Sequence, residues 1–150
     1  MAILGMGVDI LHVPRIAALA QRKSAPRLAS RILSRLELSV WNSMAVEDTG
    51  AKLRFLAVRY VPLGQHGIRG IAHMLLHSWS VKEAAYKALY PHARPTWKEL
   101  TFLDDPSDVY GKKPTLRYLP KDAAAKPSVC LHASVSHDGD YVFATVLAEA

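Results

Sequence analysis

Residues 79–89 show the clearest helical pattern in the chain, and they include neither glycine nor proline. At about 100° per residue, the small apolar residues of this segment share one arc of a helix: Val81, Ala84, Ala85 and Ala88. This arc predicts a helix that packs closely against a sheet. Glu83 and Lys87 lie one turn apart, on or beside the opposite arc. Such a pair is typical of a solvent-exposed helix surface, so it indicates function only if other residues join it.

Alternating apolar and polar residues predict a strand at residues 3–13, and further strands are expected at residues 100–103, 115–119, 129–137 and 141–147. The last two strands flank residues 137–140, where Asp138 and Gly139 predict a hairpin turn because glycine reaches positive φ easily. In the first strand, Gly5, Gly7 and Asp9 fall on the same side. We interpret that side either as room for a ligand to approach the backbone or as a strand end where Asp9 caps a turn.

Helices are expected at residues 14–22, where Pro14 suits the first turn, and at residues 27–41 and 51–59. The second of these helices carries three arginines at outer positions: Arg27, Arg31 and Arg35. A basic helix can bind nucleic acid, but these arginines have no interleaved aromatic residues. A docking surface for an acidic protein explains them equally well.

Residues 60–78 interrupt the helical pattern, which resumes at Trp79. The segment contains Pro62 and three glycines, all of which disfavour a helix interior. His73 and His77 are spaced as two ligands on a helix would be. They are weak evidence for a metal site, because the segment contains no carboxylate or thiolate to complete it.

Length, charge and cysteine content limit the possible classes. A chain of 150 residues fits one domain, and none of its apolar runs reaches the roughly 18 residues of a membrane span. No leader pattern is visible, so a cytoplasmic location is expected and a mitochondrial one is not excluded. The single cysteine, Cys130, lies in an apolar run and is expected to be buried. The formal charge of +6 favours an anionic partner: nucleic acid, a phosphorylated cofactor or an acidic protein.

Three motifs occur in order along the chain: Gly5-Met-Gly-Val-Asp-Ile10, Trp79-Ser-Val-Lys-Glu-Ala-Ala-Tyr-Lys87 and Ser134-Val-Ser-His137. Together they resemble the signatures of the holo-acyl-carrier-protein synthase group of 4′-phosphopantetheinyl transferases. Arg31-Ile-Leu-Ser-Arg-Leu-Glu-Leu38 is similar to a further segment of that family. The resemblance extends over nearly the whole chain.

The resemblance implies an α+β fold in which a small antiparallel sheet packs on a long central helix, as one domain over residues 1–150. It implies transfer of 4′-phosphopantetheine from coenzyme A to a serine of an acyl carrier protein, as in fatty acid biosynthesis, with release of 3′,5′-ADP. It also implies a homotrimer with the coenzyme A site between subunits. The implied macromolecular partner is an acidic carrier protein, rather than nucleic acid or a membrane.

By the same resemblance, Asp9 and Glu83 are the carboxylates that hold Mg²⁺, and they form the catalytic set together with Lys87. The implied coenzyme A-binding residues are Arg59, Lys82, Lys87, Ser136 and His137. Glu83 and a water on the metal are both candidates to accept the serine proton, and the sequence leaves both open.

The chain departs from the family pattern at residues 60–78, which separate Arg59 from Trp79 although the family motif runs through both without a break. A retained intron or an incorrect gene model is our leading interpretation of this insertion. The alternative function is therefore a catalytically impaired paralogue or mis-spliced form, which keeps the fold and binds coenzyme A or carrier protein without efficient transfer. Ser39 stands where some family members have a carboxylate, so no base is inferred there.

Overall fold

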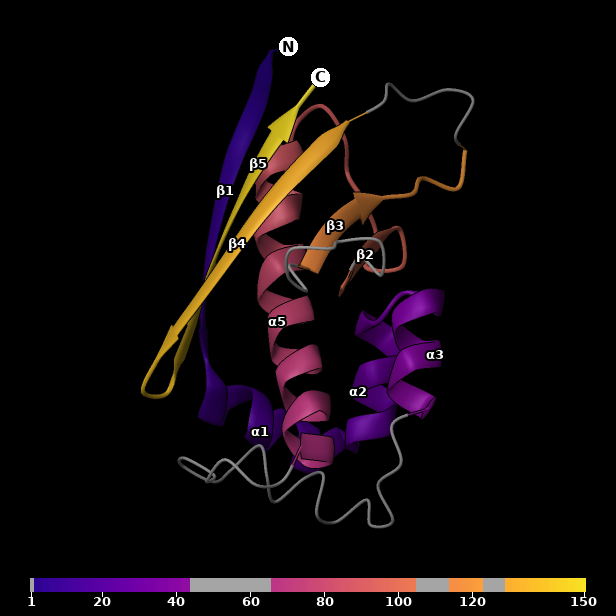
Figure 1. Ribbon diagram of the computed structural model, residues 1–150, viewed down its shortest axis with the longest axis vertical. Coiled ribbons are helices and arrows are strands. Elements are labelled where there is room, and N and C mark those ends of the chain that lie inside the picture. Colours follow the sequence, from indigo (N-terminus) through magenta and orange to yellow (C-terminus); the bar gives the residue numbers. More distant parts are fainter. Residues whose placement is uncertain (1, 44–65, 105–113, 123–128) are drawn as a thin grey trace.

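An antiparallel sheet wraps along one side of the long helix α5 (Figure 1). The computed structural model describes residues 2–43, 66–104, 114–122 and 129–150, without the side chains of residues 21, 66–74 and 104. The elements in these ranges are β1 (Ile3–His12), α1 (Val13–Lys23), α2 (Ala25–Ile32), α3 (Arg35–Ser43), α5 (His66–Leu89), β2 (Leu100–Asp104), β3 (Pro114–Tyr118), β4 (Cys130–Asp138) and β5 (Tyr141–Glu149). Within them the sheet has the order β1-β5-β4-β3-β2, with antiparallel neighbours. The α+β fold expected from the sequence, with a small sheet on a long central helix, is confirmed.

The apolar arc of α5 faces the sheet, as its small side chains predict. Its four small residues are fully buried and pack against alternate residues of β5: Ala144, Val146 and Ala148. A β-carbon on Gly5 would lie 2.4 Å from the Ala88 carbonyl oxygen, and one on Gly7 would lie 1.9 Å from that of Ala84. These glycines therefore let the α5 backbone approach β1. The space beside them holds α5, rather than the ligand that was one of the two interpretations of this side of the strand.

The predicted hairpin joins β4 to β5, and Gly139 adopts a φ of 52° at its turn. The two chain ends meet at the opposite end of the sheet, where the Ala2 and Ala150 backbones exchange hydrogen bonds of 3.1 and 2.9 Å (Figure 1). Beside the hairpin, the Val13 amide donates to the Asp140 carbonyl at 2.8 Å, so the turn also holds the start of α1.

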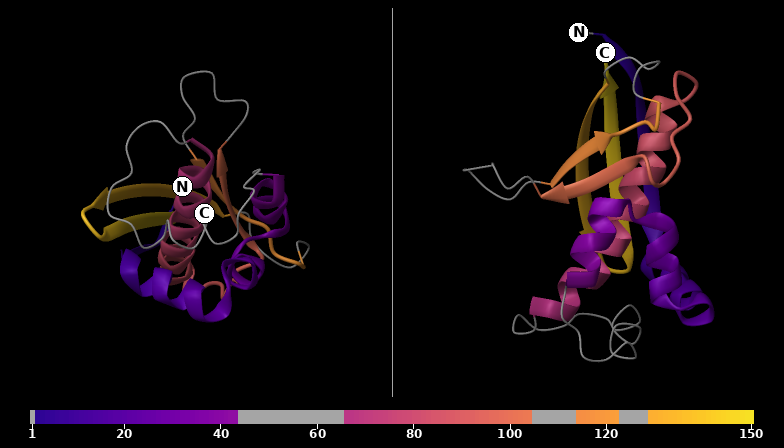
Figure 2. Two further views of the ribbon diagram at one scale, coloured as in Figure 1. Left: turned by 90° about the horizontal axis from the view of Figure 1, so that it is seen from below. Right: turned by 90° about the vertical axis from the view of Figure 1, so that its right-hand side faces the viewer.

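A second apolar cluster lies where α1 and α2 meet the N-terminal half of α5, below the sheet in Figure 1. Its fully buried members include Leu11, Ile16, Leu33 and Leu75. The two further views in Figure 2 show α1, α2 and α3 gathered around this end of α5. None of the helices in the described ranges is long and apolar enough to span a membrane.

The single helix expected at residues 27–41 is two helices, α2 and α3, with a break at Leu33 and Ser34. Ser34 and Glu37 form a capping box at the start of α3. The Ser34 amide donates to Glu37 Oε2 at 2.6 Å, and the Glu37 amide donates to Ser34 Oγ at 3.3 Å. This Ser-x-x-Glu signal is present in the sequence, but the apolar spacing continues across it and predicts one helix.

Helix α5 begins at His66, so the interruption predicted for residues 60–78 is wrong for residues 66–78. Buried Leu75 and Leu76 explain why this half is helical despite its glycines. Burying a leucine contributes about 1.5–3 kcal/mol, whereas a helical glycine costs about 1 kcal/mol. Residues 60–65, and the helix expected at 51–59, lie outside the described residues.

Candidate active site

An ion pair between Asp9 and Lys87 joins β1 to α5. Lys87 Nζ donates to Asp9 Oδ1 at 3.0 Å and to the Val8 carbonyl at 2.7 Å. Ser80 Oγ, on the preceding part of α5, donates to the other oxygen, Asp9 Oδ2, at 3.2 Å. The Lys87 side chain is 49% exposed and that of Asp9 is 17% exposed, so the pair is open to solvent on the lysine side.

Glu83 lies one turn before Lys87 on α5 and interacts electrostatically with the same groups. Partial burial raises the pKa of Glu83, and the nearby charge of Asp9 raises that pKa further. Lys87 and Arg15 oppose this rise in the pKa. Two carboxylates and two cations, from β1, α1 and α5, therefore act on one another at one place.

The carboxylates suit Mg²⁺, which prefers oxygen ligands and often binds through one or two carboxylates together with phosphate oxygens and water. Asp9 raises the pKa of Glu83, and a cation held between the two carboxylates would relieve that repulsion. In the part of the chain that the structure describes, no group of three or more His, Cys, Asp or Glu side chains is arranged to hold a metal ion.

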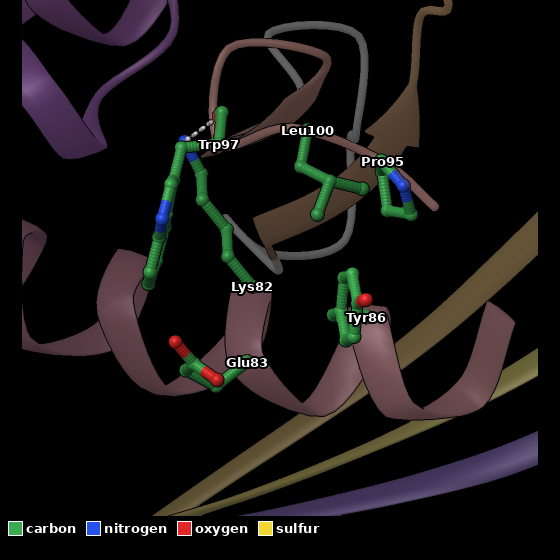
Figure 3. A pocket seen from close by; sticks show the side chains of 6 residues that line it. All are labelled: Lys82, Glu83, Tyr86, Pro95, Trp97 and Leu100. Carbon is green, nitrogen blue, oxygen red and sulfur yellow. Dashed lines mark hydrogen bonds between the residues drawn. The ribbon is translucent and has the colours of Figure 1, made fainter. Parts of the chain in front are cut away.

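A cavity of about 230 Å³ opens beside Glu83. Figure 3 shows α5 on one side of this cavity and the segment that carries Pro95, Trp97 and Leu100 on the other. Tyr86 and Lys82 complete its lining. The lining of the cavity therefore contains both apolar side chains and polar groups, among them the carboxylate of Glu83.

Lys82 points away from Asp9, into the interior, and its side chain is 1% exposed. Its Nζ donates to the Ile32 carbonyl at 2.8 Å, to Glu37 Oε2 at 2.5 Å and to the Trp97 carbonyl at 3.0 Å. Burial lowers the pKa of Lys82, and the charge of Glu37 opposes this change. Because these three acceptors match the three protons of an ammonium group, the hypothesis that Lys82 binds coenzyme A phosphates does not fit the structure.

The remaining coenzyme A candidates lie elsewhere. Ser136 and His137 are exposed residues of β4 and pair with Phe143 and Val142 of β5. Since β5 separates β4 from β1, these residues are two strand spacings, about 10 Å, from the strand that carries Asp9. Arg59 lies outside the described residues. The described structure thus brings together Asp9, Glu83 and Lys87, and it leaves Ser136 and His137 apart from them.

A basic groove runs along α1 and α2 and encloses about 490 Å³. Its basic lining residues are Arg22, Lys23, Arg27 and Arg31, and its apolar ones are Leu19, Leu28, Ile32, Trp79 and Trp97. Trp97 also lines the cavity beside Glu83, so the two hollows share a wall. The rings of Trp79 and Trp97 pack against each other with centroids 5.3 Å apart.

Sequence reasoning missed several residues of this site, notably Arg15, Ser80 and Trp97. Ser80 could have been suspected, because it lies within the Trp79–Lys87 motif. Arg15 is the residue after Pro14 and has no motif of its own. Trp97 reaches the site only through the fold of the segment after α5, which leaves no periodic signal.

Comparisons with known proteins show the family to which the chain belongs. The family model described as the 4′-phosphopantetheinyl transferase superfamily matches residues 5–146. The chain is 35% identical to a holo-[acyl-carrier-protein] synthase of Klebsiella pneumoniae, with all of both chains covered. It is 31% identical to one of Paraburkholderia phymatum, with 99% of this chain and 96% of that protein covered.

Solved structures share the fold. The holo-[acyl-carrier-protein] synthase of Neisseria meningitidis is 25% identical and has a TM-score of 0.63. The match covers 99% of this chain and all of the other. The synthase of Plasmodium yoelii is 20% identical and has a TM-score of 0.66, and the match covers 98% of this chain and 94% of the other. The Bacillus anthracis synthase, solved in complex with coenzyme A (3′,5′-ADP), is 19% identical and has a TM-score of 0.62, with coverages of 99% and 97%. The family resemblance inferred from the motifs is confirmed, and the chain belongs to the 4′-phosphopantetheinyl transferase superfamily.

Proposed function

We propose that this protein transfers 4′-phosphopantetheine from coenzyme A to a serine of an acyl carrier protein and releases 3′,5′-ADP. The observation that carries the proposal is the meeting of Asp9, Glu83 and Lys87 where β1 passes α5. The family match and the holo-[acyl-carrier-protein] synthase relatives support the same reaction. The catalytic set is intact, which favours an active enzyme over an impaired paralogue.

In this reaction the serine oxygen forms a bond to the phosphorus that carries the pantetheine arm, and the bond from that phosphorus to the leaving 3′,5′-ADP breaks. The reaction therefore needs positioning and charge stabilisation more than covalent help from the protein. Asp9 and Glu83 would hold Mg²⁺, which when bound supplies positive charge against the pyrophosphate.

Lys87 and Glu83 have separate parts in this scheme. Lys87 Nζ uses two of its protons on Asp9 and the Val8 carbonyl, and its third can reach a pyrophosphate oxygen. Glu83 is a carboxylate in the same cluster and is one candidate for the proton acceptor. It or a neighbouring water takes the proton of the attacking serine.

The nucleotide end of coenzyme A would lie against Tyr86 of α5 and Tyr90, which directly follows the helix. Tyr86 and Tyr90 are 41% and 51% exposed, and their rings stack with centroids 6.4 Å apart. The guanidinium of Arg94 lies 5.3 Å from the centre of the Tyr90 ring. Tyr90 follows Glu83 by about two helical turns, or roughly 10 Å, which suits the distance from a pyrophosphate to its base. A purine could therefore stack on these rings.

An acidic carrier protein would dock on the basic groove between α1 and α2. The groove pairs four cationic side chains with an apolar floor, and the whole chain carries a formal charge of +6. Because Trp97 lines both this groove and the cavity beside Glu83, a carrier seated there would present its serine close to Glu83.

The outward face of the sheet supports assembly into a trimer. Large apolar side chains of β1 and β5 are exposed on it: Met6, Val8, Ile10, Tyr141 and Phe143. Cys130 of β4, expected to be buried, is also exposed. An open apolar sheet face of this kind is typical of a surface covered by other subunits.

A second subunit could also bring its Ser136 and His137 to the site at Asp9, Glu83 and Lys87. Light scattering is expected to give a trimer, and a fully active monomer would contradict it.

The reaction itself is tested by its small product. The purified chain is incubated with coenzyme A, Mg²⁺ and an apo acyl carrier protein, and 3′,5′-ADP is measured by chromatography. We expect release in equal amount to the modified carrier, and none when carrier or Mg²⁺ is withheld. Release that does not depend on the carrier would mean hydrolysis of coenzyme A and would contradict the proposal.

A further inference from the structure

Glu37 of α3 is a carboxylate without exposed surface, and the proposed reaction gives it no direct part. Its Oε2 accepts hydrogen bonds from the Ser34 amide at 2.6 Å and from Lys82 Nζ at 2.5 Å. Its Oε1 accepts from Ser78 Oγ at 2.9 Å and from the Phe102 amide at 3.3 Å. Glu37 therefore connects the start of α3 to α5 and to β2.

Two of these donors hold α5 itself. Ser78 and Lys82 lie one turn apart on the same face of the helix, and each contacts a different oxygen of Glu37. Two directional contacts on one face fix both the rotation of α5 about its axis and its position along that axis. Lys82 adds two further contacts, to the carbonyls of Ile32 in α2 and of Trp97 after α5.

The turn that Glu37 holds is the one that carries the candidate active site. Ser80, between the two contacts, donates to Asp9, and Glu83 directly follows Lys82. We propose that Glu37 is a positioning residue, whose hydrogen bonds to α5 set the place of Glu83 relative to Asp9. The role in catalysis rests on the proposed function.

Capping of α3 accounts for only one of the four hydrogen bonds that Glu37 accepts, and the other three come from α5 and β2. Apolar residues of similar volume often stabilise a protein as well as a buried ion pair does, but they do not fix direction. Catalytic geometry depends on direction, since a displacement of about 1 Å can lower a rate on the order of a hundredfold. Groups that orient metal ligands typically change metal affinity by about 10- to 100-fold when they are removed.

The test compares two buried carboxylates. Glu37→Gln keeps the shape but places an amide among groups that all donate hydrogen bonds, so at least one contact to Glu37 is lost. Ser78→Ala removes a single contact and gives a milder change. Glu99→Gln is the control, because Glu99 is buried and accepts from Thr96, after α5, and from the Lys121 amide, after β3. Thermal unfolding followed by circular dichroism identifies a temperature at which every variant is folded, and the assays are run at that temperature.

Two quantities are measured on each variant: kcat for transfer, and affinity for Mn²⁺, used as the metal probe, by water-proton relaxation. We expect Glu37→Gln to lower both by about tenfold or more, Ser78→Ala to lower both by a smaller factor, and Glu99→Gln to leave both within about twofold. Unchanged values in Glu37→Gln, or equal losses in Glu99→Gln, would overturn the positioning role. If Glu37→Gln does not fold, Ser78→Ala decides, and values equal to those of the wild type overturn the inference.

The two readouts also separate this inference from the proposed function. Weaker Mn²⁺ binding in Glu37→Gln, in a protein that modifies no carrier, would support the positioning role and contradict the transfer. Full transfer by the wild type with no effect of Glu37→Gln on either quantity would support the transfer and contradict the positioning role.

Discussion

Two lysines of α5 pair with carboxylates, and the surroundings of the two pairs differ sharply. In the Lys82–Glu37 pair the side chains are 1% and 0% exposed, and the N–O distance is 2.5 Å. In the Lys87–Asp9 pair they are 49% and 17% exposed, and the distance is 3.0 Å. The chemistry is the same, yet the first pair lies inside the fold and the second is open to a substrate.

The face of the helix, rather than the motif, separates the two roles. Lys82 and Lys87 belong to one family motif, but five helical residues turn the second about 140° from the first. A buried ion pair lacks solvent and needs all its partners, whereas an exposed pair keeps protons and lone pairs available. A charged residue of a functional motif can therefore hold the helices around the site in place without contacting the substrate.

The largest effect is expected from breaking the buried pair. Lys82→Ala leaves Glu37 charged and without its cation in the interior, so the free energy of unfolding should fall by about 3–5 kcal/mol. Urea denaturation followed by circular dichroism measures this change. A loss below about 1 kcal/mol would place the Lys82–Glu37 pair in the same class as a surface pair.

The exposed pair should respond in the opposite manner. Asp9→Asn is expected to change the free energy of unfolding by less than about 1 kcal/mol. It should lower the transfer rate by about a hundredfold or more, because it removes both a metal ligand and the partner of Lys87. Rates measured over a range of Mg²⁺ concentrations provide the check. A near-normal rate at low Mg²⁺ would show that Asp9 is not a ligand.

Deleting residues 60–78 would change the surroundings of the buried Lys82–Glu37 pair. The deletion joins Arg59 to Trp79 and so brings an arginine to the helical position that Ser78 now occupies, where its guanidinium would replace Ser78 as the donor to Glu37. It also removes helical glycines, which cost about 1 kcal/mol each. We expect thermal stability and transfer rate both to rise, as a foreign insertion would require. A fall in either would mean that the packing of Leu75 belongs to the native protein.

The smallest effect concerns pH. The pKa of Glu83 is raised in the folded protein, first by burial and then by Asp9. The folded state therefore favours the protonated form of Glu83, and the free energy of unfolding falls as pH rises through the folded pKa. In EDTA at neutral pH, Glu83→Gln should be more stable than the wild type by less than about 1 kcal/mol, since solvent screens the partly exposed group. Below the ordinary value near pH 4.5 this advantage should vanish, and thermal melts across pH measure it.

The parts of the fold that repeat a local period could be predicted from the sequence. The apolar arc of α5, the alternation in β1 and the turn at Gly139 each follow from the geometry of one element. The break between α2 and α3 has a local signal as well, in Ser34 and Glu37. Apolar spacing that continued across it concealed that signal.

Other features depend on contacts between distant parts of the chain. Nothing within Lys82-Glu83 states which side chain enters the interior, because that depends on where α3 and Trp97 lie. Gly5 and Gly7 signal a close approach, but only the fold identifies the α5 backbone as what approaches. The helical half of α5 before Trp79 is determined by burial of Leu75 and Leu76, against local propensity.

We propose that this chain modifies an acyl carrier protein at a site built on Asp9, Glu83 and Lys87. Intact-protein mass spectrometry of an apo carrier, after incubation with this chain, coenzyme A and Mg²⁺, tests it most directly. We expect the carrier to gain the mass of one phosphopantetheine with the wild type, and little or none with Glu83→Gln at equal concentration and time. A carrier whose mass stays unchanged with the wild type, or rises equally with Glu83→Gln, would contradict the account.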